Sequence, residues 1–139
     1  MSFLAKLIIE DNDFNLLSIS FGVRSNYDPL SLRASGAPQM STIDLTIEST
    51  SSGGFFKWSL DARDKKDGKI VFFKRDAMAG SRTLKFKQAS LVDYNERFNS
   101  TDSNAMITNL KMVVEEIVFE DGIYKNPAYD FDFKNPEMQ

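Results

Sequence analysis

Residues 41–49, STIDLTIES, show most clearly how this chain folds. Isoleucine and leucine alternate with threonine, aspartate and glutamate, so every second side chain is apolar. A period of two is typical of a β-strand with one side in the core and the other in water. The stretch therefore predicts a strand in a sheet that has one buried face.

Similar stretches lie on both sides of residues 41–49 and are separated by turn-forming residues. We expect further strands over residues 3–10, 15–23, 69–75, 82–90, 91–98 and 106–120. The alternation changes phase near Leu16 and Leu17, which predicts a β-bulge. About seven or eight strands with regular turns are typical of a compact β-barrel or sandwich. The sequence thus predicts one mostly β domain over residues 1–139, with a tail of uncertain order over residues 121–139.

One short helix is expected over residues 55–60. Phe56 and Leu60 lie four residues apart, which is a helical spacing, and Trp58 lies between them. We expect Phe56, Trp58 and Leu60 to anchor this helix in the core, where it closes one end of the barrel. Further along the chain, Asp67–Gly68 indicates a hairpin turn.

Residues 24–40 differ from the rest of the chain because they follow neither a helical nor a strand period. Irregular loops of this length are uncommon in compact domains and are usually functional or disordered. The segment also carries Tyr27, Leu30, Leu32 and Met40, which are more apolar than a solvated loop needs. It is therefore predicted to be an extended loop that docks on another surface.

Composition excludes several classes of function. The chain has no histidine and no cysteine, which removes the commonest general base, thiolate nucleophiles and the commonest ligands of transition metals. A net charge of −3 argues against a nucleic-acid partner, whose binding domain is normally basic. We therefore expect no catalytic residue, no cofactor, no metal and no nucleic acid.

The beginning of the chain does not resemble a signal peptide, because no basic segment precedes its apolar residues and Lys6 interrupts them. No stretch reaches the roughly 20 apolar residues of a membrane-spanning helix. We expect a protein that is made and folded in the cytosol, without membrane insertion.

Two other classes of function are weighed against these expectations. The pairs Asp44 with Glu48 and Glu115 with Glu116 are carboxylates of the kind that glycosidases use, but they lie on ordinary strand faces. The many aromatic residues are also compatible with a monomeric β-barrel that binds a small molecule. Such a barrel would show a large apolar pocket, and an enzyme would show two carboxylates that converge in a cleft.

Seven segments of the chain, taken in their order and spacing, resemble one protein family. They are residues 2–7 (SFLAKL), 20–22 (SFG), 33–39 (RASGAPQ), 42–49 (TIDLTIES), 56–58 (FKW), 69–78 (KIVFFKRDAM) and 92–99 (VDYNERFN). The family is Hcp, the haemolysin-coregulated tube proteins of bacterial type VI secretion systems, and the resemblance is to its short, divergent branch. Phage tail-tube proteins share the architecture and are the nearest alternative.

The resemblance implies a β-barrel with one helix, six copies of which close into a ring, and rings that stack into a tube. It implies sheath proteins, a spike protein at the tip and effector cargo in the lumen as partners. It also implies a protein that is cytoplasmic when assembled and secreted through the injection system. Within this scheme the extended loop reaches a neighbouring subunit or ring. The residues predicted to make that interface are Arg24, Tyr27, Leu30, Leu32, Arg33 and Gln39.

Overall fold

The computed structural model describes residues 3–49, 54–74, 80–101, 103 and 106–125. The elements are β1 (Phe3–Ile9), β2 (Asn12–Ser20), β3 (Val23–Asp28), β4 (Arg33–Met40), β5 (Ile43–Glu48), α1 (Phe55–Ser59), β6 (Lys66–Lys74), β7 (Gly80–Phe98), β8 (Met106–Val113), β9 (Glu116–Phe119) and β10 (Gly122–Lys125). The prediction of a mostly β chain with one short helix is confirmed.

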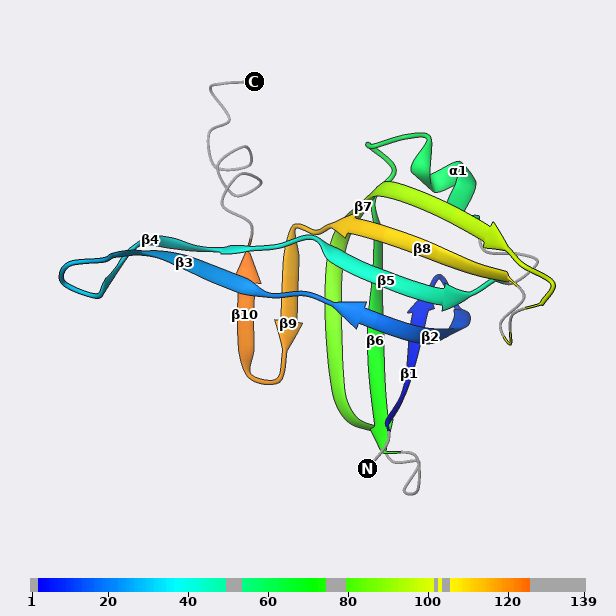
Figure 1. The fold of residues 1–139 in the computed structure, drawn as a ribbon, viewed down its shortest axis with the longest axis horizontal. Coiled ribbons are helices and arrows are strands. Elements are labelled where there is room, and N and C mark those ends of the chain that lie inside the picture. Colours follow the sequence, from blue (N-terminus) through cyan, green and yellow to red (C-terminus); the bar gives the residue numbers. More distant parts are fainter. Residues whose placement is uncertain (1–2, 50–53, 75–79, 102, 104–105, 126–139) are drawn as a thin grey trace.

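The main sheet closes into a barrel. Its strands follow the order β10-β9-β7-β6-β1-β2-β5-β8, and β8 also pairs with β7. Strands β7, β6, β1, β2, β5 and β8 therefore form a closed ring, while β9 and β10 continue the sheet outside it (Figure 1). Closure leaves the barrel strands without an unpaired edge.

The barrel interior is filled by side chains. Leu7, Ile43, Ile70, Leu84 and Met112 are fully buried there, together with other apolar residues from all of the barrel strands. The alternation of residues 41–49 is confirmed, because the isoleucines and the leucine of β5 are buried. The bulge expected near Leu16 is also confirmed, since the register between β2 and β5 shifts there.

Two predicted strand boundaries are wrong, and both errors concern strands that pair with β7. Residues 82–98 form the single strand β7 rather than two strands, and residues 106–120 form β8 and β9 rather than one. Gln88 has a positive φ of 56°, which lets β7 continue through an irregularity. The first half of β7 pairs with β9 and its second half with β8, so the chain must turn between those two strands.

The prediction of a hairpin turn at Asp67–Gly68 is wrong. These residues form an irregularity within β6. The register between β6 and β7 shifts between Lys66 and Gly68, and the Asp67 carboxylate accepts a hydrogen bond from the backbone N–H of Gln88 at 2.9 Å. A side chain at position 68 would meet the ring of Phe86. Glycine is thus needed here for close packing.

The short helix is confirmed, but two of its three predicted anchors are wrong. Trp58 is 1% exposed and donates a hydrogen bond from its indole N–H to the backbone oxygen of Asp64 at 2.5 Å. Phe56 and Leu60 are 63% and 70% exposed. Because α1 has only five residues, one side of it contacts the barrel, and Phe55 and Trp58 occupy that side.

Part of the predicted tail is ordered, because residues 122–125 form β10, while residues 126–139 lie outside the described residues. Among the described residues, no helix has the length and apolar character needed to cross a membrane.

Candidate assembly surface

Residues 24–40, predicted as an irregular loop, instead belong to an antiparallel hairpin of β3 and β4 that we call the arm (Val23–Met40). Figure 1 shows the arm extending away from the barrel. Its strand period is hidden in the sequence because three residues of β4, Gly36 to Pro38, oppose a single residue of β3. Gly36 has a φ of 80°, a conformation that glycine adopts without strain.

The pairing register gives the arm two different sides. Val23, Tyr27 and Ala34 share one side, since Tyr27 pairs with Ala34 and residues two apart on a strand face the same way. The other side is polar and carries both arginines of the arm. Its paired residues are Arg24 with Gln39, Asn26 with Ser35, and Asp28 with Arg33.

The tip of the arm is held by local hydrogen bonds. The Asp28 carboxylate accepts one from the backbone N–H of Leu30 and one from the Ser31 hydroxyl, each at 3.0 Å. The first of these, aided by the second, lowers the pKa of Asp28 from its ordinary value. Leu32, with a φ of 57°, donates its N–H to the backbone oxygen of Asp28 at 2.7 Å. Leu30 and Leu32 are thereby fixed at the tip, where Leu30 is 95% exposed.

The base of the arm is tied to the barrel. The backbone N–H of Ser41 donates to the oxygen of Gly22 at 2.8 Å, and the Ser41 hydroxyl accepts from the N–H of Gly22 at 3.0 Å. The Tyr124 hydroxyl of β10 accepts from the N–H of Met40 at 3.2 Å. These bonds anchor the arm at one end only, and its β3 side chains are all exposed.

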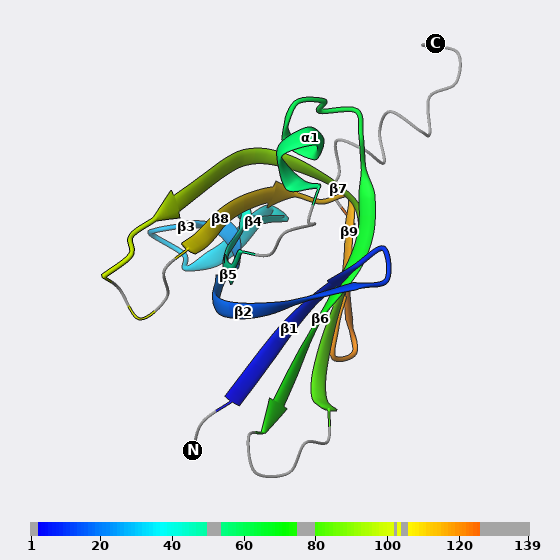
Figure 2. The ribbon, with the colours of Figure 1, turned by 90° about the vertical axis from the view of Figure 1, so that its right-hand side faces the viewer.

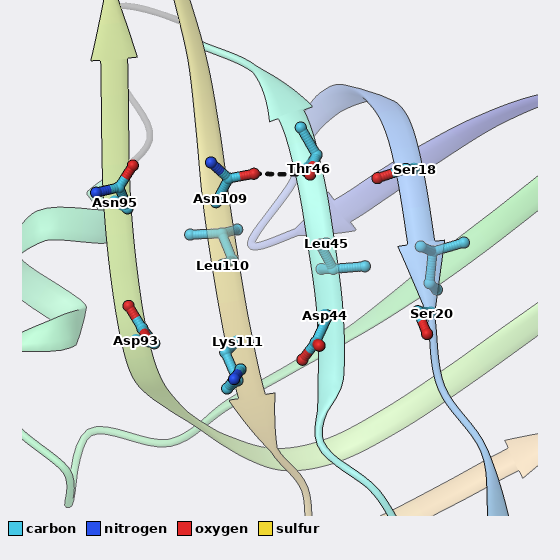
Figure 3. A pocket seen from close by; sticks show the side chains of 11 residues that line it. Ser18, Ser20, Asp44, Leu45, Thr46, Asp93, Asn95, Asn109, Leu110 and Lys111 are labelled. Carbon is cyan, nitrogen blue, oxygen red and sulfur yellow. Dashed lines mark hydrogen bonds between the residues drawn. The ribbon is translucent and has the colours of Figure 1, made fainter.

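A second surface is the outer side of β2, β5, β8 and β7, whose central part carries polar side chains. Its residues form two rows across the four strands (Figure 3). The rows are Ser18–Thr46–Asn109–Asn95 and Ser20–Asp44–Lys111–Asp93. They line a shallow hollow of about 490 Å³. We call this surface the polar face.

Two hydrogen bonds involve side chains of the polar face. The Thr46 hydroxyl donates to the Asn109 amide oxygen at 2.8 Å, and the Thr42 hydroxyl donates to the Asp44 carboxylate at 2.9 Å. In the register, Lys111 lies between Asp44 and Asp93, so this row places one lysine between two aspartates. This surface can face water or bind a polar ligand.

A family model described as hemolysin coregulated protein Hcp (TssD) matches residues 1–127. The chain belongs to the Hcp family. Among solved structures, this Hcp chain is similar to Hcp1 from Flavobacterium johnsoniae, with 29% identity and a TM-score of 0.82 over 88% of this chain and 99% of that one. The family prediction made from the seven segments is confirmed. Comparison with curated protein sequences finds no match.

Two structures of other injection systems share the fold of this Hcp chain. One is a chain of the six-fold symmetrised baseplate of the anti-feeding prophage, with 11% identity and a TM-score of 0.53 over 85% of this chain and 91% of that one. The other is a chain of the sheath–tube complex of PVC, an extracellular contractile injection system, with 17% identity and a TM-score of 0.50 over 84% and 87%. At these identities the likeness concerns the fold alone.

The predicted interface residues of this Hcp protein all lie on the arm. Arg24, Arg33 and Gln39 are on its polar side, Tyr27 is on its apolar side, and Leu30 and Leu32 are at its tip. Sequence reasoning did not assemble the polar face as a site. The alternation of residues 41–49 indicated a solvated side for Asp44 and Thr46. No single strand shows that β2, β5, β8 and β7 lie next to one another.

Proposed function

We propose that this chain is the tube subunit of a type VI secretion system and that six copies close into a ring. The observation that carries the proposal is the match to the Hcp family over residues 1–127. The six-fold symmetrised baseplate that contains a similar chain supports the ring number. Stacked rings then form the tube that is propelled into a target cell.

The arm supports assembly through a head-to-tail contact. An isolated two-stranded hairpin is at best marginally stable in water. Tyr27, Leu30 and Leu32 are exposed on this hairpin, so a partner surface that covers them would stabilise it. A contact between two different surfaces of identical copies generates a ring when the rotation closes. We therefore place the arm, with Arg24, Arg33 and Gln39, at the subunit or ring interface.

The polar face is the side of the barrel best suited to the lumen. A water-filled channel needs a wall that stays solvated, and the two rows of the polar face carry hydroxyl, amide and charged groups. The hollow between Ser18 and Lys111 would take effector cargo through hydrogen bonds. The remaining partners of the proposal are the sheath around the tube and the spike at its tip. The protein is cytoplasmic when assembled and leaves the cell through the injection system.

The small-molecule barrel is less well supported. The interior of the barrel is packed with side chains, including Trp58 and Phe86, rather than hollowed for a ligand. The hollow of about 490 Å³ lies instead on the polar face. The proposed role is structural, and it assigns no catalytic step to any residue.

The mass of the protein in solution tests the proposal directly. We expect light scattering coupled to size exclusion to give a mass near that of six chains of 15.8 kDa each at high concentration. Electron microscopy of the same fractions should show rings with an open centre. A monomer at every concentration, without rings, contradicts the proposed assembly.

A further inference from the structure

The ends of β7 and β8 that lie far from the arm expose an apolar surface. Phe98 pairs with Met106 in the register, and the two are 66% and 44% exposed. Tyr94 lies on the same side of β7 as Phe98, and its ring is 6.0 Å from that of Phe56 on α1. We call this surface, formed by Phe56, Tyr94, Phe98 and Met106, the aromatic groove.

The groove belongs to the barrel wall and not to its core. Tyr94, Phe98 and Met106 continue the inward-facing side of β7 and β8, and Phe56 comes from α1. Phe98 and Met106 lie beyond the buried residues Leu110 and Met112 of β8. A small hollow of about 120 Å³ is lined by Phe56, Tyr94 and Glu96, together with residues of β5 and β8. Figure 2 shows α1 lying over β7 and the ends of β7 and β8 extending away from the barrel.

One carboxylate lies within this apolar surface. Glu96 is on the same side of β7 as Tyr94 and Phe98, and its carboxylate accepts a hydrogen bond from the Tyr94 hydroxyl at 2.5 Å. Across the described part of the chain, Glu96 forms no ion pair. The groove therefore offers aromatic contacts around one negative charge.

The arm has the complementary composition. Its tip presents Leu30 and Leu32, its apolar side presents Tyr27, and Arg33 lies next to the tip. Within the described residues, the Arg33 guanidinium forms no ion pair. The arm thus places apolar side chains beside the positive charge of Arg33, and the aromatic groove places apolar side chains beside the negative charge of Glu96.

The positions of the two surfaces show that one chain cannot join them. In Figure 1 the arm extends from one end of the barrel, and the ends of β7 and β8 extend from the other. The arm is also held at its base by Ser41 and Tyr124, so it points away from its own groove. A contact between arm and groove therefore requires two copies of the chain.

We propose that the aromatic groove is the acceptor for the arm of a second copy, with Leu30 and Leu32 against Phe98 and Met106 and Arg33 beside Glu96. This inference rests on the proposed function, because it names the surface that the arm contacts in the assembled tube. It adds that α1 and the β7–β8 end, and not the polar face, receive the arm.

Cysteine cross-linking tests the contact, because the natural chain has no cysteine. The variant with both Leu32→Cys and Met106→Cys is assembled and treated with a short bismaleimide. We expect covalent dimers and longer oligomers on a denaturing gel. The control pairs Leu32→Cys with Ile123→Cys, which is 67% exposed on β10, and should remain largely monomeric on that gel.

The outcomes separate this inference from the proposed function. Rings that form without cross-links between positions 32 and 106, or with equal cross-linking in the control, overturn the groove but leave the tube subunit standing. A protein that remains monomeric and is not cross-linked overturns both.

A charge exchange gives a second test that does not depend on cross-linking. Arg33→Glu alone and Glu96→Arg alone should each reduce the fraction of ring in light scattering at least tenfold, because each places like charges together. The double variant should recover most of the ring. Equal loss in the double variant contradicts the pairing, and a cooperative thermal unfolding transition in each single variant shows that the fold is intact.

Discussion

Gly68 lies in β6 at a point where the side chain of Phe86 crosses the strand. A Cβ atom at position 68 would lie 2.6 Å from Cζ of Phe86 and 2.8 Å from the backbone oxygen of Ile8. We expect Gly68→Ala to lower the free energy of unfolding by about 1–3 kcal/mol, since overpacking forces neighbours to move. Chemical denaturation measures the change.

The matched control for that substitution is Gly22→Ala. A Cβ atom there would have no neighbour within 4 Å, so we expect a change within about 0.5 kcal/mol. Equal effects at the two glycines would show that packing against Phe86 is not the cause.

The hydrogen bond between Tyr94 and Glu96 predicts a pH dependence. This bond, with burial as a smaller cause, raises the pKa of Tyr94 to about 12 from an ordinary value of 10.0. Because the pKa of Tyr94 is higher in the folded state than in the unfolded state, the folded state keeps the phenolic proton to a higher pH. The stabilising contribution is complete below about pH 10 and is lost as the pH rises to about 12.

Ultraviolet difference titration of the tyrosines checks this shift. We expect one tyrosine to titrate near pH 12, and Tyr94→Phe should remove that step and so assign it. Glu96→Gln should bring the step back toward pH 10, because the neutral amide no longer disfavours the phenolate. A titration curve that Glu96→Gln leaves unchanged contradicts the assignment.

At the scale of elements, α1 was predicted correctly as a helix, but the side chains predicted to be buried were partly wrong. The helical spacing of residues 55–60 was sufficient to predict the helix. It did not show which side faces the barrel, because Phe55 with Trp58 and Phe56 with Leu60 are both acceptable apolar pairs. Packing against Phe14, whose ring centroid is 4.9 Å from that of Phe55, selects the first pair.

The two sides of α1 therefore predict different effects on stability. Trp58→Ala should cost about 3–5 kcal/mol, because it removes a fully buried aromatic side chain. Phe56→Ala, on the same helix, should cost less than about 1 kcal/mol because Phe56 is largely exposed. Thermal or chemical unfolding of both variants measures this difference. Similar losses for the two variants would mean that α1 contributes as a whole and not through Trp58.

The arm shows a different limit of sequence reasoning. Strand prediction relies on alternation, and the three residues of β4 that oppose one residue of β3 interrupt it. The same segment has no buried side, so burial does not impose a pattern on it. The apolar residues Tyr27, Leu30 and Leu32 still marked it as a docking segment, because their exposure needs an explanation outside the chain.

At the scale of the whole molecule, the order of the strands creates surfaces that the sequence alone could not show. Strands β2 and β5 were recognisable from their own period, whereas the extents of β7, β8 and β9 were not. The seven Hcp-like segments predicted the family. The polar face and the aromatic groove combine residues from strands distant in sequence, such as Ser18 with Asn109. Long-range pairing of β5 with β8 and of β8 with β7 creates both surfaces. Only the assembled barrel therefore shows that its two ends and one of its sides differ in chemistry.

Removal of the arm tests whether ring formation depends on the contact between the arm and the aromatic groove. Val23 and Met40 are directly opposite in the register, so an Asn-Gly turn in place of residues 24–39 would join these two residues directly. The barrel should fold normally, because the β3 side chains are all exposed and the residues of β4 other than Met40 are exposed too.

We expect the variant without the arm to remain a monomer in light scattering at concentrations where the natural chain forms rings. Its single tryptophan, Trp58, reports on the fold, and its fluorescence and unfolding midpoint should match those of the natural chain. Rings of normal size from this variant would show that the barrel walls alone assemble. In that case the arm, and with it the aromatic groove, would have no part in ring closure, and the polar face would be the next surface to alter.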